Sequence, residues 1–189
     1  DATKVLQQGI EKAGENARLY IMMADVAYRK KGSDQSREFL TKALAIDPKN
    51  ETAYLRLTGM YRSDGDREKA LATLTQGIEQ LPDSKPLKFD QADIYLDMGN
   101  LGHADQLIEV MAKDQPDTAP LYYLRGRRAM LNMQTRQAIK YLEMAREKQA
   151  TPQVRLLLAR AYLIADELGA AQRELDSLLR EQRDPGIIV

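Results

Sequence analysis

Residues 51–84 read ETAYLRLTGMYRSDGDREKALATLTQGIEQLPDS, and this stretch decides the fold of the chain. Large apolar residues recur at helical spacing on both sides of the turn Asp64-Gly65-Asp66, and Pro82 closes the stretch. Small residues occupy the positions where two helices would touch. The pattern therefore predicts an antiparallel pair of helices joined by a tight turn.

The same pattern recurs along the chain in steps of 34, 34, 34 and 33 residues. These steps separate the small residues near the start of each second helix, which are Ser36, Ala70, Ala104, Ala138 and Ala171. The first helices show the same period in a small residue at Ala24, Thr58, Ala92, Gly126 and Ala159. A fixed period of this length is typical of stacked helical repeats. We expect five hairpins, at residues 17–50, 51–84, 85–118, 119–151 and 152–185, followed by a tail at 186–189.

The repeating unit resembles the tetratricopeptide repeat. The resemblance is carried by an aromatic residue, Leu, a small residue and Tyr in the first helix, then Ala, Leu and a closing Pro: Tyr54, Leu57, Thr58, Tyr61, Ala70, Leu74 and Pro82. It implies an all-α fold, a right-handed superhelical solenoid of antiparallel helix hairpins that spans residues 1–189 as one domain. It also implies a protein–protein interaction scaffold whose first helices line a concave groove for a peptide or partner protein.

Both ends of the chain suggest a hypothesis about its origin. Residues 1–14 align with the second helix of a repeat whose first helix is missing, and the chain does not begin with Met. We therefore interpret the chain as a fragment of a larger protein, whose truncated ends would allow self-association. As an alternative function, the repeats would form a spacer or docking arm of a larger bacterial enzyme, or of an envelope export or assembly protein of the polysaccharide or pilus type.

Composition narrows the range of partners. The chain has 28 Lys and Arg against 28 Asp and Glu, so no overall positive charge favours nucleic acid. It has no Cys, and no apolar run approaches the ~18 residues that a membrane-spanning helix needs. The compartment is left open between bacterial cytoplasm and periplasm.

No combination of residues indicates catalysis. The single histidine, His103, lies near the start of a second helix, away from the packing positions, and acid–base chemistry needs a positioned partner. The glycines occur one by one in turns or helix contacts, not in a phosphate-binding loop. We expect no enzymatic activity, no cofactor and no metal site.

The resemblance assigns partner binding to groove positions on the five first helices. The residues that we predict to bind a partner are Tyr28, Leu55, Arg56, Arg62, Phe89, Asp90, Asp93, Asp97, Tyr123, Leu124, Arg127, Met130, Leu131 and Arg160. The other groove positions are Arg18, Ile21, Met22, Asp25, Arg29, Gly59, Ser63, Leu96, Leu156, Leu157, Leu163 and Ile164. In the last two repeats these positions are mostly aliphatic, which predicts either a binding surface or a face that packs on further repeats.

Three groove residues, Asp90, Asp93 and Asp97, share one face of one helix. They would either receive a basic side chain or form a ladder of ion pairs with neighbouring repeats, where Arg56 matches the position of Asp90 and Arg127 that of Asp93. We favour the ladder, whose exposed pairs contribute about 0–1 kcal/mol each. Three carboxylates on one helix do not complete the shell of about six oxygens that Ca²⁺ requires, which disfavours a metal.

One glycine predicts a stability effect. Gly77 lies in a helix interior, where Gly costs about 1 kcal/mol relative to Ala, and the same repeat position holds Ala43 and Ala145. We therefore predict that Gly77→Ala stabilises the protein.

Overall fold

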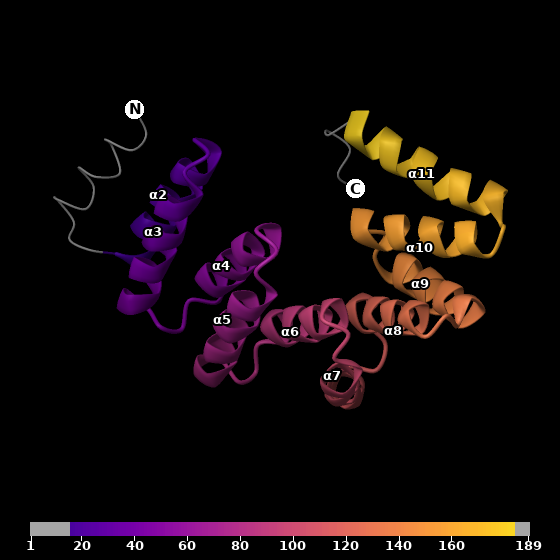
Figure 1. The fold of residues 1–189 in the computed structure, drawn as a ribbon, viewed down its shortest axis with the longest axis horizontal. Helices are drawn as coiled ribbons and strands as arrows, with labels where there is room; N and C mark the ends of the chain where they lie inside the picture. The colour runs from indigo at the N-terminus through magenta and orange to yellow at the C-terminus, as the bar shows by residue number, and fades with distance from the viewer. Residues whose placement is uncertain (1–15, 184–189) are drawn as a thin grey trace. The chain divides into compact units, whose positions relative to one another are not determined.

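The computed structural model describes residues 16–183, and this part of the chain is built from ten helices without strands (Figure 1). The predicted half-repeat at 1–14 and the tail at 186–189 lie outside the described residues. The helices are α2 Ala17–Arg29, α3 Ser33–Ile46, α4 Glu51–Ser63, α5 Arg67–Gln80, α6 Lys85–Asp97, α7 Leu101–Asp114, α8 Ala119–Leu131, α9 Thr135–Lys148, α10 Pro152–Ile164 and α11 Leu168–Arg183. The chain divides into two compact units, residues 1–94 and 95–189.

The first helix of each hairpin has 13 residues and begins where the repeat pattern starts a new unit. Polar side chains fix several of these starts. The Oδ1 atom of Asn50 accepts a hydrogen bond from the Ala53 N–H at 3.1 Å, and the Thr151 hydroxyl accepts one from Val154 at 3.3 Å. Such caps satisfy backbone donors that the first helical turn leaves free. The second helices pack antiparallel to the first, as α8 and α9 show in Figure 1.

The turn inside each hairpin repeats one backbone feature. A single residue has a positive φ angle, at Lys31, Gly65, Gly99, Met133 and Asp166. The next backbone N–H then donates to a carbonyl five residues back, for example Gln134 to Ala129 at 2.9 Å. This left-handed turn ends the first helix and reverses the chain. Glycine adopts it without strain at two of the five positions.

The first unit has an apolar core at the predicted repeat positions. Leu40, Leu74 and the small residue Ala24 are at most 2% exposed, and Thr58 is fully buried. Tyr54 packs with Ala70 and Leu74, and α6 adds Leu87 and Ile94 to the same cluster. Helices this short are marginal in isolation, so their stability comes from contacts between neighbouring hairpins.

The second unit has the same kind of core. Leu142, Leu158 and Ala161 are fully buried, and Tyr162 packs with them. Burial and a 2.6 Å hydrogen bond from its hydroxyl to Glu143 raise the pKa of Tyr162 to about 12. The buried carboxylate of Glu174 on α11 holds the guanidinium groups of two preceding helices, with Arg146 at 2.5 Å and Arg155 at 3.0 Å. Charged pairs thus fasten α9, α10 and α11 around the apolar core.

The prediction that Gly77→Ala stabilises the protein is wrong. A Cβ atom on Gly77 would lie 2.9 Å from Cγ of Tyr54 and 3.0 Å from Cδ1 of Leu87. Leu87 belongs to the following hairpin, and the equivalent residue one repeat earlier is Ala53, which leaves room beside Ala43. Tyr54 and Leu87 together therefore leave no room for a larger residue at position 77.

Candidate functional site

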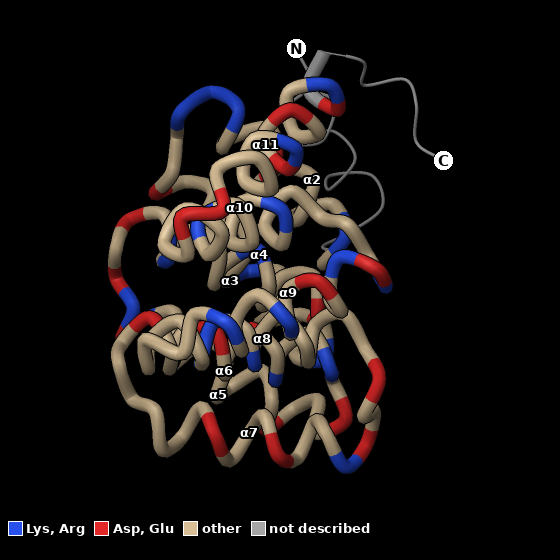
Figure 2. The backbone as a smooth tube through the Cα atoms, turned by 90° about the vertical axis from the view of Figure 1, so that its right-hand side faces the viewer, with Lys and Arg blue, Asp and Glu red and all other residues tan. Residues whose placement is uncertain are grey.

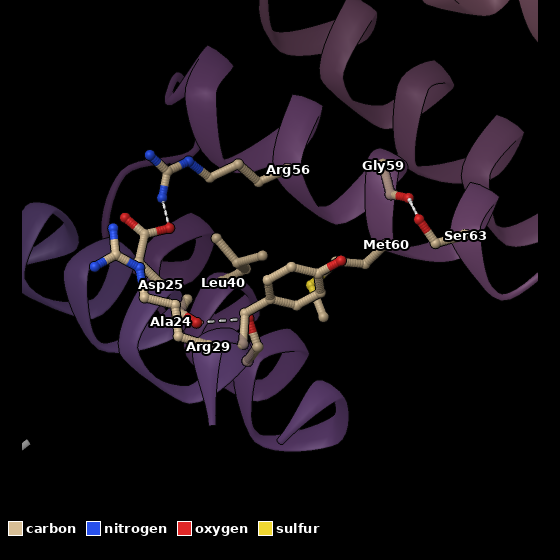
Figure 3. Close-up of a pocket in the computed structure, with 10 residues that line it drawn as sticks. Ala24, Asp25, Arg29, Leu40, Arg56, Gly59, Met60 and Ser63 are labelled. Atoms are coloured by element: carbon tan, nitrogen blue, oxygen red, sulfur yellow. Dashed lines mark hydrogen bonds and ion pairs between the residues drawn. The ribbon is translucent and has the colours of Figure 1, made fainter. Parts of the chain in front are cut away.

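A cleft of about 510 Å³ opens in the first unit between α2 and α4, with α3 beneath it (Figure 3). Its floor consists of buried residues, namely Ala24, Ser36, Leu40 and Met60. Its walls are more exposed and come from predicted groove positions on the two first helices: Asp25, Tyr28, Arg29, Arg56, Gly59 and Ser63. Sequence reasoning missed the floor residues, because small and apolar residues at core spacing look the same whether or not a cleft opens above them.

The wall of the cleft carries charged side chains and one aromatic side chain. The guanidinium of Arg56 donates to the carboxylate of Asp25 across the cleft, as Figure 3 shows. Within the described residues Arg29 has no hydrogen bond or ion pair, so one cation of the wall is left for a ligand. Tyr28 is 53% exposed and offers an aromatic face. On the floor, the Ser36 hydroxyl already donates to the Ala24 carbonyl at 2.8 Å, so this polar atom needs no ligand.

Gly59 lines the α4 wall of the cleft without a side chain. A Cβ atom at this position would meet no other atom within 4 Å, so packing does not require glycine there. Glycine in a helix interior nevertheless costs about 1 kcal/mol relative to alanine. Gly59 lies on the exposed side of the helix and lines the cleft together with Met60 (Figure 3).

Ion pairs connect neighbouring first helices, as the ladder hypothesis predicted, but one pair has a different partner. Arg56 turns back to Asp25 on α2, not forward to Asp90 on α6. Further along the same unit, Arg62 donates to Asp93 at 2.8 Å. The side chain of Asp93 is only 5% exposed, and the guanidinium of Arg62 compensates its negative charge.

Asp90 differs from the other carboxylates of the groove. It is half-buried on α6 and accepts no hydrogen bond from the described residues. The pKa of Asp90 is raised to about 6, mainly by burial; the charge of Arg62 lowers the pKa and that of the neighbouring Asp93 raises it. Leu55 and Phe89 of the predicted site are half-buried in the same unit.

In the second unit the predicted site residues split between exposed and buried positions. Asp97 accepts from Arg127 at 2.6 Å, and the guanidinium of Arg127 lies 6.0 Å from the centre of the Tyr123 ring. This pair is a further ion pair between first helices, here α6 and α8. The predicted Asp93–Arg127 pair joins residues of different units and stays a prediction.

Leu124 departs from the prediction, because it is fully buried and has no surface for a partner. The same repeat position holds Arg56 and Asp90 in earlier hairpins. Their charges need water, whereas an aliphatic side chain gains free energy by turning into the interior. By contrast, Leu131 and Arg160 are exposed, and Met130 is half-buried.

The described residues contain no group of three or more His, Cys, Asp or Glu side chains placed to bind a metal ion. His103 is exposed, stacks on Tyr95 with ring centres 5.0 Å apart, and its Nδ1 atom lies 2.9 Å from Asn100 Oδ1. Among the helices of residues 16–183, none is both long and apolar enough to cross a bilayer. Charges of both signs are spread along the helices, as Figure 2 shows.

Comparison with known proteins decides the family. The sequence pattern of the tetratricopeptide repeat matches residues 32–86 and 61–127, which together cover just over half of the chain. The chain belongs to the tetratricopeptide repeat family. The fold of this family is typically a non-catalytic protein-interaction module. No curated protein gives a significant sequence match.

Solved structures of other tetratricopeptide repeat proteins share the fold. A thermophilic protein of Thermus thermophilus, TTC0263, is 19% identical with a TM-score of 0.74, and the match covers 91% of this chain and 93% of that one. YrrB, described as having an unusual peptide-binding site, is 15% identical with a TM-score of 0.60, covering 96% and 94%. MamA of Desulfovibrio magneticus RS-1 is also 15% identical, with a TM-score of 0.60, covering 90% and 97%. These identities establish similarity of fold alone.

Proposed function

We propose that this protein is an interaction scaffold that binds a peptide segment of a partner protein in the cleft between α2 and α4. The observation that carries the proposal is the cleft itself, about 510 Å³ in volume and walled by groove positions of two successive first helices. This volume lies within the range of about 300–1,000 Å³ that is typical of ligand sites. Gly59 supports the proposal, because packing does not require a glycine at this position of the cleft wall.

The cleft favours a peptide that combines an apolar side chain with an acidic group. Leu40 and Met60 on the floor and Tyr28 on the wall offer apolar contact area. The wall carries two arginines and one aspartate, a net charge of +1, and the Arg56–Asp25 pair leaves Arg29 to attract a carboxylate. YrrB gives the idea a precedent in this family, since its own description names a peptide-binding site.

A phage library of random dodecapeptides, selected on the wild-type protein, tests this proposal. Gly59→Leu should fill the cleft without loss of stability, because the added side chain meets open space on a helix that gains propensity. We expect cleft-binding peptides to lose about tenfold or more in affinity for Gly59→Leu, which corresponds to ~1.4 kcal/mol.

Gly102→Leu is the matched control. Gly102 is also exposed and helical, and a Cβ atom there also meets nothing within 4 Å, but it lies on α7 of the other unit and does not line the cleft. Affinities should be unchanged in this variant. If every selected peptide bound Gly59→Leu as tightly as wild type, the cleft would not be the binding site.

The alternative function, a spacer or docking arm of a larger bacterial enzyme or envelope export protein, stays a prediction. It differs from the scaffold proposal in one measurable respect. A spacer needs no peptide affinity of its own, so a library that yields no specific peptide would favour the spacer.

A further inference from the structure

A separate surface of the second unit has unusual exposed side chains. On α10, Leu156, Leu163 and Ile164 are 60%, 51% and 58% exposed. They are spaced i, i+7 and i+8, and the exposed Arg160 lies at i+4, so all four share one face of the helix. We call Leu156, Arg160, Leu163 and Ile164 the α10 stripe. Three large aliphatic side chains on one helix face are more than scattered surface residues.

The neighbouring helix α8 extends the apolar surface. α8 and α10 contact each other within the second unit. Leu131, at the end of α8, is 47% exposed, and Met130 beside it is half-buried. Exposed or half-buried apolar side chains therefore occur on two successive first helices of the unit.

The charges of α8 and α10 all have the same sign. Together the two helices contain five arginines, at 125, 127, 128, 155 and 160, and no Asp or Glu. Four of them are engaged inside the unit. Arg127 binds Asp97 at 2.6 Å, Arg128 binds Asp105 at 2.7 Å, Arg155 binds Glu174 at 3.0 Å, and Arg125 lies over the Tyr141 ring at 5.8 Å. Within the described residues only Arg160, in the middle of the α10 stripe, has no partner of any of these kinds.

We propose that the α10 stripe docks a segment of a partner protein that presents aliphatic side chains around one acidic residue. The partner's carboxylate would pair with Arg160 while its aliphatic groups cover Leu156, Leu163 and Ile164. This combination removes apolar area from water and partners the cation at the same time. The inference rests on the scaffold role proposed above, but not on the cleft, which lies in the other unit.

The charge pattern also argues against other occupants. A basic segment would meet Arg160, whose charge no described residue pairs, and no Asp or Glu on α8 or α10, so its approach would be disfavoured. Attraction to an anionic membrane surface usually needs a cluster of about four to eight Lys and Arg residues, at about 1 kcal/mol each. The stripe has one unengaged arginine.

The dodecapeptide selection tests this inference separately from the cleft. Peptides that bind wild type but not Leu163→Asp report on the stripe, whereas Gly59→Leu should leave them bound. We expect their sequences to be rich in Leu, Ile, Val and Met, to carry at least one Asp or Glu, and to be poor in Lys and Arg. Leu179→Asp is the matched control, because Leu179 on α11 is also 51% exposed and lies outside the stripe.

A charge swap gives the sharpest result. In fluorescence anisotropy, Arg160→Glu should weaken binding of a selected acidic peptide at least tenfold, and replacing the acidic residue of that peptide by Lys should restore binding to Arg160→Glu. The inference would be overturned if the selected peptides had no acidic residues. It would also be overturned if Arg160→Glu did not change their affinity, or if the peptide with Lys bound Arg160→Glu no better than the acidic peptide did. Two other results would also overturn the inference. One is that the protein binds phosphatidylserine vesicles and not peptides, and that Leu163→Asp abolishes the vesicle binding. The other is that the protein dimerises in sedimentation equilibrium and that Leu163→Asp abolishes the dimer.

Discussion

Asp90→Asn should stabilise the protein at neutral pH, because Asp90 carries its charge where charge is disfavoured. The side chain is half-buried on α6 and accepts no hydrogen bond from the described residues. The nearest favourable charge is on Arg62, but that guanidinium donates to Asp93 at 2.8 Å. Asparagine has almost the same shape and no charge, so the substitution removes the penalty and leaves the packing in place.

The pKa of Asp90 sets the magnitude. It rises from the ordinary value of 3.8 to about 6 in the folded protein. The difference is about 2 pKa units, and at about 1.36 kcal/mol per unit it corresponds to at most about 3 kcal/mol. Because the folded protein holds the proton more tightly than the unfolded chain, this group costs nothing below pH 3.8. Its cost grows as the pH rises from about 4 to 6 and is constant above pH 6.

Urea unfolding followed by circular dichroism measures the effect. The free energy of unfolding of Asp90→Asn should exceed that of wild type by up to about 3 kcal/mol at pH 7, and the two should converge near pH 4. Asp93→Asn is the control. It should lower stability, since it weakens the pair that a carboxylate with 5% exposure makes with Arg62. An Asp90→Asn variant no more stable than wild type at pH 7, or a gain that does not change with pH, would refute the reasoning.

Two further predictions concern glycine. Gly77→Ala should destabilise the protein by about 1–3 kcal/mol in urea unfolding, because the new Cβ atom would lie 2.9 Å from Tyr54. Gly59→Ala, the matched change at an open position, should gain up to about 1 kcal/mol, and equal effects at the two positions would contradict the packing argument. Met133→Gly should raise the free energy of unfolding by about 1 kcal/mol and should also raise the thermal unfolding midpoint. Met133 has a φ angle of 59°, which strains a residue with a Cβ atom, and its side chain is 90% exposed, so little packing is lost. Met133→Ala keeps a Cβ atom in the left-handed conformation and should bring no such gain; an equal gain from both variants would show that backbone strain is not the cause.

The helices and their contact positions could be predicted because they depend on properties that every repeat shares. A small residue is needed wherever two helices of a hairpin touch, and such residues as Ala24, Ala70 and Ala138 are buried as the period indicates. The first helices likewise begin at the residues where the pattern places them. Helical periodicity and punctuation act over a few residues, so a single sequence displays them.

The details that were mispredicted depend on neighbours outside the repeat itself. The size allowed at Gly77 is set by Tyr54 together with Leu87 on the next hairpin, and the repeat pattern compares equivalent positions without comparing their surroundings. Arg56 can reach either adjacent first helix, and its long side chain takes Asp25 because that carboxylate lies across the cleft. Ion-pair partners depend on side-chain torsions that a linear pattern does not contain.

Three features of the first helices cost stability or solubility, and all occur at predicted groove positions. Gly59 gives up helix propensity without a packing reason, Asp90 keeps a charge in a half-buried place, and the α10 stripe leaves large aliphatic side chains in water. One substitution each would remove the first two costs, and the exposed positions of the stripe would accept polar residues. In a fold whose core positions otherwise follow the expected pattern, departures from local rules are expected mainly at functional sites. A binding role for the groove would explain all three costs, and it predicts that Gly59→Ala and Leu163→Asp preserve or improve folding while weakening the binding of selected peptides.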